Sequence, residues 1–229
     1  MPDTAHPRSI RSFVTRAGRI TAAQERALEE LWPAFGVDFA ARALELPAVF
    51  GRNAPCTLEI GFGNGENLVT LAAAHSARDY LGIEVHRPGV GRALLALKER
   101  GLSNVRLVCH DAVEVLERQI APGSLDEVLI LFPDPWPKKR HHKRRLVQAP
   151  FVALIARALA MGGTLHLATD WEPYAREMLA VLGAAPGFEN AAPGGGFSAR
   201  PAERLPTRFE RRGTRLGHEV WDLAFRRQA

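Results

Sequence analysis

An acid, an aromatic ring and a cluster of cations share one stretch of the chain, LILFPDPWPKKRHHKRR at residues 129–145. The opening LILF is short, apolar and followed by Pro133, which has no N–H to donate to a ladder, so it predicts a buried strand that stops there. Asp134 and Trp136 then stand just past the carboxyl end of a strand, where ligands bind in open α/β sheets. These two side chains are candidates for holding a planar substrate.

A basic cluster follows, and the sequence contains no acid between it and Asp170. Such a concentration of charge favours a polyanion, most naturally a nucleic acid, as partner, although most charge runs are solvated surfaces. The lead-in with its two flanking prolines favours the first interpretation, because a disordered tail has no reason to follow a core strand. The cluster consists of Lys138, Lys139, Arg140, His141, His142, Lys143, Arg144 and Arg145.

A second motif, CTLEI-GFGNG-ENLVTLAAAH, predicts a strand, a tight turn and a helix. In the turn, Gly61, Gly63 and Gly65 leave the backbone free to approach a ligand closely at a helix N-terminus. Glu66 stands where a dinucleotide fingerprint needs a third Gly or Ala, which counts against NAD. The next strand, YLGIEV, delivers Glu84 about 20 residues further on, where an acid accepts hydrogen bonds from ribose hydroxyls. An adenosine-type cofactor fits both features.

Two later strands also deliver acids. VRLVC is followed by Asp111, which could accept from an exocyclic amine such as adenine N6 or could cap the helix AVEVLERQI, and both alternatives stay open. TLHLAT is followed by Asp170 and Trp171, which repeats the pairing of an acid with an aromatic ring. Further on, TRFE at 207–210 combines a hydroxyl, a cation, a ring and a carboxylate in a segment that returns to the sheet through HEVWDLAF.

The elements that position these groups alternate along the chain. Residues 1–20 carry four arginines against one acid and predict a flexible basic arm. Thr21 with Gln24 matches a capping box that begins a peripheral helix. Further helices are expected at 88–100, at 151–159 with Gly162-Gly163 as its end, and at 172–182, and residues 183–199 predict a surface loop.

Length, composition and charge limit the classes of protein to which the chain can belong. With 229 residues, 46% of them hydrophobic, the chain can bury a full core and is most simply one domain with modest additions. The net charge of +5 fits nucleic acid better than membrane, and no apolar run approaches the ~20 residues of a transmembrane helix. The start lacks a signal peptide, so we expect a cytoplasmic protein. Cys56 and Cys109 predict buried free thiols, and the scattered histidines give a metal site little support.

Strand, GxGxG, helix and a second strand ending in Glu84 resemble the class I methyltransferases that use S-adenosylmethionine. The likeness is closer to the tRNA (guanine-N7)-methyltransferase family in LEIGFGNGENL, LGIEVHRPGVG, CHDAVEVL, LFPDPWPKKRHHKRR, ATDWEPYA and TRFERRGTRLGHEVWDL. It implies a Rossmann-like α/β fold, with a mostly parallel seven-stranded sheet, helices on both faces and an antiparallel last strand. It also implies a basic arm with a peripheral helix over residues 1–45 and a methyltransferase domain over 46–229.

The resemblance further implies S-adenosylmethionine as cofactor and tRNA as substrate, methylated at N7 of guanosine 46 in the variable loop. The implied cofactor site comprises Glu59, Gly61, Gly63, Gly65, Glu84, Asp111 and Asp134, of which Asp134 is also catalytic. The implied guanosine site comprises Lys138, Asp170, Thr207, Arg208, Phe209 and Glu210. The implied RNA-binding segment comprises Arg140, His141, His142, Lys143, Arg144 and Arg145. The family commonly has TKFE, and Arg208 in place of the Lys keeps the charge but changes the donor geometry.

The chemistry agrees with this assignment. Guanine N7 carries an in-plane lone pair and no proton, so attack on a sulfonium methyl needs alignment rather than a strong base. Asp134 can hold the donor edge of guanine and stabilise the developing positive charge, whereas His141 and His142 fit polar members of an RNA-facing loop better than bases. Two alternatives are a methyltransferase acting on an exocyclic amine and a non-catalytic RNA-binding module. The oligomeric state stays open.

Overall fold

The computed structural model describes residues 11–14, 18–202, 204, 210 and 219–228. The strands in these segments are β1 (Cys56–Ile60), β2 (Asp79–Ile83), β3 (Val105–Val108), β4 (Leu125–Leu131), β5 (Leu159–Thr169), β6 (Phe188–Asn190) and β7 (Trp221–Arg227). The helices are α1 (Ala22–Glu30), α2 (Trp32–Phe35), α3 (Leu46–Phe50), α4 (Glu66–Ala74), α5 (Arg87–Glu99), α6 (Ala112–Arg118), α7 (Ala149–Ala158) and α8 (Glu172–Gly183). A 3-10 helix, η1 (Lys139–Arg144), contains most of the basic cluster.

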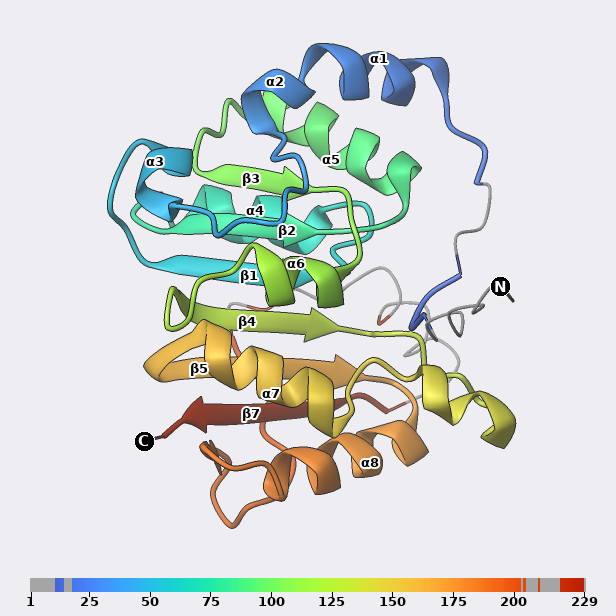
Figure 1. Cartoon of the computed structure of the whole chain (residues 1–229). Coiled ribbons are helices and arrows are strands. Elements are labelled where there is room, and N and C mark those ends of the chain that lie inside the picture. Colours follow the sequence, from blue (N-terminus) through green and yellow to red (C-terminus); the bar gives the residue numbers. More distant parts are fainter. Residues whose placement is uncertain (1–10, 15–17, 203, 205–209, 211–218, 229) are drawn as a thin grey trace, which may run out of the picture.

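The described strands form a seven-stranded sheet in the order β3-β2-β1-β4-β5-β7-β6. β1 to β5 run parallel, so their arrowheads share one edge in Figure 1, and β7 runs antiparallel to both β5 and β6. The predicted α/β class, the parallel majority and the antiparallel last strand are confirmed. Whether residues 1–45 form a separate unit stays a prediction.

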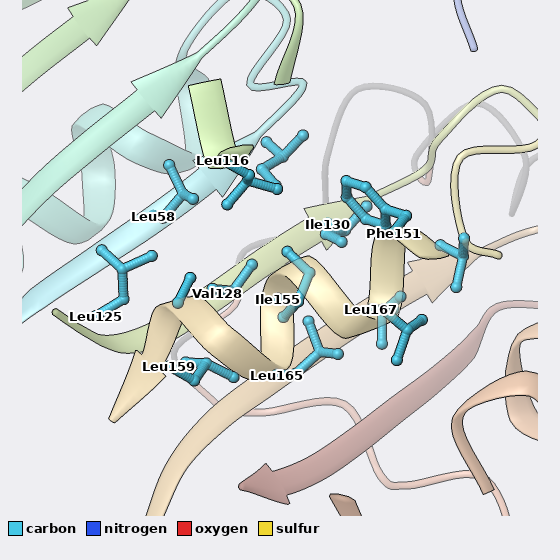
Figure 2. Close-up of a cluster of buried hydrophobic side chains, with 14 of the residues drawn as sticks. Leu58, Leu116, Leu125, Val128, Ile130, Phe151, Ile155, Leu159, Leu165 and Leu167 are labelled. Carbon is cyan, nitrogen blue, oxygen red and sulfur yellow. The ribbon is translucent and has the colours of Figure 1, made fainter. Parts of the chain in front are cut away.

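Apolar side chains fill both faces of the sheet. On one face, strand residues such as Leu58, Val128 and Leu165 pack against Leu116 of α6 and Ile155 of α7 (Figure 2). On the other face, α4 and α5 contribute a second buried cluster. Every residue of β1 is buried, including the polar Thr57 and Glu59 that alternate with its apolar residues, because helices cover both faces of a parallel sheet.

Two predicted boundaries were wrong around β5. The helix before it ends at Ala158, and β5 begins at once with Leu159, which pairs with Leu125. The register then shifts before Thr164 pairs with Glu127, and Gly162 sits in this irregularity with φ 79°. The glycine pair therefore belongs to a bulged strand, where positive φ is needed, and does not end the helix.

The segment 183–199 is not entirely loop, because it contains β6. This short strand pairs with β7, and the ring of Phe188 meets that of Phe225 edge to face with centroids 6.4 Å apart. β4 in turn ends one residue before the prediction, at Leu131, because Phe132 adopts a left-handed backbone with φ 53°.

The N-terminal helix begins as predicted. The Thr21 N–H donates to Gln24 Oε1 at 2.9 Å, and the Gln24 N–H donates to Thr21 Oγ1 at 3.3 Å. Helix α1 packs closely on α5, since a Cβ placed on Gly91 would lie 2.8 Å from the Gln24 carbonyl oxygen. Of the two free cysteines, Cys56 is buried as expected and Cys109 only half-buried. None of the described helices has the length and apolar character needed to cross a membrane.

Candidate active site

A cavity of about 720 Å³ opens at the carboxyl ends of β1 and β4. Since β2 and β3 extend from one side of β1 and β4 from the other, this is the topological switch point, where open α/β sheets bind ligands. The cavity brings together five of the predicted cofactor residues, namely Gly61, Gly63, Glu84, Asp111 and Asp134. Glu59 and Gly65 do not lie on its wall.

The three glycines of the turn differ in what surrounds them. All have positive φ, at 74° for Gly61, 58° for Gly63 and 80° for Gly65. A Cβ on Gly61 or Gly63 would meet nothing within 4 Å, so these two present bare backbone to open space in the cavity. A Cβ on Gly65 would lie 2.7 Å from Ala93 Cβ, so this glycine permits α5 to pack against the turn.

The carboxylate of Glu84 fixes the cavity wall. Its Oε2 accepts the Gly63 N–H at 2.9 Å, and its Oε1 accepts the N–H groups of Val85 and His86 at 2.7 and 2.9 Å. A carboxylate offers about four acceptor positions, so one on Oε2 remains for a ligand. Glu84 therefore ties the glycine turn to the end of β2 in addition to facing the cavity.

Two further acids differ in exposure. Asp111 is the N-cap of α6, with Oδ1 accepting the Val113 N–H at 2.9 Å, so the predicted cap is confirmed. Asp111 also lines the cavity, where its contact with an adenine amine stays a prediction. Glu59 is 3% exposed and accepts from Asn67 Nδ2 at 3.0 Å. Burial, and then the negative charge of Glu84, raise the pKa of Glu59 to about 7, although the Asn67 hydrogen bond opposes the change.

Asp134 lies on the cavity wall between two residues with unusual backbones. Phe132 and Trp136 are the non-glycine residues with positive φ among those described, at 53° and 45°. A left-handed backbone is costly for bulky residues and collects at functional sites. Asp134 therefore lies between two strained backbone positions, as residues of functional sites often do.

Trp136 is surrounded by protein groups. Its Nε1 donates to the Ser12 carbonyl at 3.0 Å, its ring meets that of His141 edge to face at 5.8 Å, and the Arg144 guanidinium lies 4.8 Å from the ring centroid. The ring thus connects η1 with the N-terminal segment, and Ser12, Phe13 and Val14 line the cavity. Residues 12–14 of the predicted flexible arm therefore form part of the cavity wall. This contact was not predicted, because the arm has no periodic pattern that would indicate packing.

The members of the basic cluster have different environments. Arg140 and Lys143 are exposed in η1, whereas Arg145 is buried, with its side chain 1% exposed. Arg145 forms an ion pair with Glu177 of α8 and donates from Nε to the Pro135 carbonyl at 2.9 Å. The prediction that Arg145 contacts RNA was therefore wrong, because its side chain is buried and Glu177, which is distant in sequence, neutralises its charge. Its two contacts instead hold the Asp134 loop against α8.

His141 of η1 packs edge to face against the Trp136 ring. Partial desolvation and the positive charges of Arg140 and Arg144 lower the pKa of His141, which favours the neutral form of its ring. A neutral ring that packs against Trp136 is consistent with a polar member of the basic surface.

The predicted guanosine residues are only partly described. Lys138 is exposed next to the loop, and Asp170 is half-buried directly after β5, the neighbour of β4. Thr207, Arg208 and Phe209 lie outside the described residues. Glu210 is buried and forms an ion pair with Arg204, a residue to which the sequence analysis gave no role.

Known proteins match the chain over most of its length. A family model described as "Putative methyltransferase" matches residues 53–223. A tRNA (guanine-N(7)-)-methyltransferase of Leifsonia xyli subsp. xyli is 61% identical over 216 residues, which cover 94% of this chain and 95% of the relative. The protein of the same name from Escherichia coli strain K12 is 55% identical over 220 residues, or 96% and 92% of the two chains. The chain belongs to the tRNA (guanine-N(7)-)-methyltransferase family.

Solved structures support the fold of this family member. The crystal structure of the 16S rRNA methyltransferase KamB has a TM-score of 0.58 at 17% identity and covers 81% of this chain and 93% of its own. A SAM-dependent O-methyltransferase from Thermotoga maritima has a TM-score of 0.51 at 16% identity, over 80% and 63% of the two chains. These likenesses establish the methyltransferase fold. Among the described residues, no group of three or more His, Cys, Asp or Glu side chains could hold a metal ion.

Proposed function

We propose that this protein transfers the methyl group of S-adenosylmethionine to N7 of a guanosine in tRNA, at position 46 of the variable loop, in the cytoplasm. The observation that carries the proposal is the position of Asp134, between a glycine-lined cavity and a basic helix. The names of the relatives at 55% to 61% identity support the same reaction and the same substrate.

The cavity residues fit the cofactor. Its volume of about 720 Å³ lies within the roughly 300 to 1,000 Å³ of small-molecule sites. Gly61 and Gly63 give backbone access, the remaining acceptor position of Glu84 suits a ribose hydroxyl, and Asp111 Oδ2 suits the adenine amine. When bound, S-adenosylmethionine supplies an electrophilic methyl group on a sulfonium.

The protein's contribution to the reaction is alignment. Guanine N7 has its lone pair ready, so no residue must remove a proton from it. Asp134 accepts hydrogen bonds from the N1–H and N2–H donors of guanine, which turns N7 toward the cavity. Its negative charge also stabilises the positive charge that the base gains as the methyl arrives.

The basic helix supplies affinity without chemistry. The exposed Arg140 and Lys143 contact phosphates, which dominate affinity for nucleic acid but carry no sequence information. Arg144 is held over Trp136, so a phosphate that it binds is placed relative to the Asp134 loop. This arrangement separates RNA binding from the reacting atoms.

The experiment uses purified protein, tRNA and S-adenosylmethionine with a labelled methyl group. Asp134→Ala should bind tRNA nearly normally and lose turnover by roughly tenfold to a hundredfold or more, as expected for the loss of hydrogen bonds to a charged group. Asp126→Ala is the matched control, because it removes an acid from the opposite end of β4, next to the Cys56 N–H. The control should keep its turnover, and wild-type turnover in Asp134→Ala would refute the role of this acid.

A modified RNA distinguishes the atom that is methylated. A tRNA with 7-deazaguanosine at the target position keeps the donor edge and the ring face but has carbon in place of N7. It should bind and resist methylation. Methyl incorporation there would show an exocyclic-amine methyltransferase, and absence of S-adenosylmethionine binding in titration calorimetry would show a non-catalytic RNA-binding module.

A further inference from the structure

A buried arginine joins three parts of the molecule beside the site. Arg204 is 6% exposed, and its Nη1 and Nη2 donate to the Glu210 carboxylate at 2.6 and 3.3 Å. Its Nε and Nη2 donate to the Asp222 carboxylate in β7 at 3.0 and 3.1 Å. The guanidinium also lies 5.8 Å from the ring centroid of Phe132, on the cavity wall.

The chemistry of this cluster favours a geometric role. One guanidinium lies between two carboxylates whose side chains are 8% and 7% exposed, and Arg200, which also approaches Glu210 at 3.4 Å, is 47% exposed. Buried ion pairs seldom gain net stability, because desolvation offsets their attraction. The planar fork of arginine instead fixes the orientation of each carboxylate that it binds in a bidentate manner.

We infer that Arg204 is a positioning residue for methyl transfer, which anchors Glu210 to β7 through Asp222 and sets both against the cavity wall at Phe132. This inference rests on the proposed function and on the guanosine contact of Glu210 that the family resemblance implies. β7 is a rigid base for the contact, because it pairs with β5 from Thr164 to Thr169. Arg204 thereby places a substrate group without touching the reacting atoms.

The test is a double-mutant cycle that uses Asp222→Asn, Glu210→Gln and both together. Each single change should lower kcat by roughly tenfold to a hundredfold, as small misplacements at active sites do, while the Kd for S-adenosylmethionine is unchanged. If Asp222 acts through Arg204 on Glu210, the double variant should be no slower than Glu210→Gln alone, because groups acting as one unit are not additive. Two independent losses that multiply would overturn the inference.

Asp79→Asn is the matched control for loss of a buried ion pair. Asp79 is 2% exposed, accepts from Arg52 Nε at 2.8 Å and lies at the amino end of β2, away from the cavity. This control variant should have a lower melting temperature and an unchanged kcat.

Arg204→Lys, which keeps the charge and loses the planar fork, should reproduce the loss of kcat even if Asp222→Asn fails to fold. Wild-type kcat in Arg204→Lys would overturn the inference. A wild-type kcat in Glu210→Gln would instead refute the substrate role of Glu210 and, with it, the proposed anchoring, whereas multiplying losses refute the anchoring alone.

Discussion

The raised pKa of Glu59 predicts an unusual pH dependence of stability. The carboxyl group has an ordinary pKa of 4.5, and burial raises it to about 7 in the folded protein. The folded state therefore binds this proton more tightly than the unfolded state does. The stabilisation from protonated Glu59 is fully present below pH 4.5 and is lost as the pH rises through 7. The difference between the two pKa values corresponds to roughly 3 kcal/mol of unfolding free energy.

The assay is urea unfolding of the wild type and Glu59→Gln at intervals from pH 4.5 to pH 8. The introduced glutamine resembles the protonated acid: it can accept from Asn67 Nδ2, and it adds a donor for Asn67 Oδ1, a buried atom that has no partner among the described residues. The unfolding free energy of the wild type minus that of the variant should fall by about 3 kcal/mol across this range.

The subtraction isolates Glu59 from other titrating groups. Burial lowers the pKa of His166, which makes stability rise with pH, the opposite sign to Glu59. Burial raises the pKa of Asp222, which has the same sign as Glu59. Both groups are common to the two proteins and cancel. A difference that stays flat with pH would show that Glu59 is ionised in the folded protein throughout and would refute the reasoning.

Two further comparisons test the roles of neighbouring residues. Arg140→Ala and Lys143→Ala should each reduce the slope of log Kd for tRNA against log salt by roughly 0.7 to 0.9. Arg145→Ala should leave the slope unchanged and cost about 3 kcal/mol in urea unfolding, because it breaks a buried ion pair. Equal slopes in all three variants would mean that η1 is only a solvated surface. Gly65→Ala should cost about 2 to 5 kcal/mol, from its left-handed backbone and its close contact, whereas Gly61→Ala should cost only the backbone part, about 1 to 2 kcal/mol, and weaken cofactor binding. Calorimetry and urea unfolding separate the two glycines, and equal stability losses would contradict the difference in packing.

The position of the site could be predicted from the sequence because a proline, a helix cap and a glycine turn each determine the backbone over only a few residues. Pro133 cannot donate to a ladder, and the predicted strand end was correct to within one residue. Asp111 was predicted as a possible helix cap, and the cap hydrogen bond is present. The glycine turn likewise lies where the strand-turn-helix pattern placed it.

The contacts that could not be predicted from the sequence join residues that are distant along the chain. Arg144 and Arg145 are adjacent and chemically identical, yet one lies over Trp136 and the other is buried against Glu177, 32 residues away. The contact of Ser12 with Trp136 spans 124 residues. No periodic pattern encodes such contacts, because they depend on how finished elements pack.

The loop around Asp134 shows why these distant contacts matter for the chemistry. A reaction that depends on alignment needs its positioning group held to within a fraction of an ångström. The left-handed backbones of Phe132 and Trp136 each cost about 1 to 3 kcal/mol and persist only if neighbours fix them. Each part of the loop has such a neighbour: Arg204 lies over Phe132, and Arg145 bonds the Pro135 carbonyl. Trp136 is held in turn by the arm and by η1. Weakening any one of these contacts should therefore reduce turnover before it reduces tRNA affinity, since affinity comes from phosphates outside the loop.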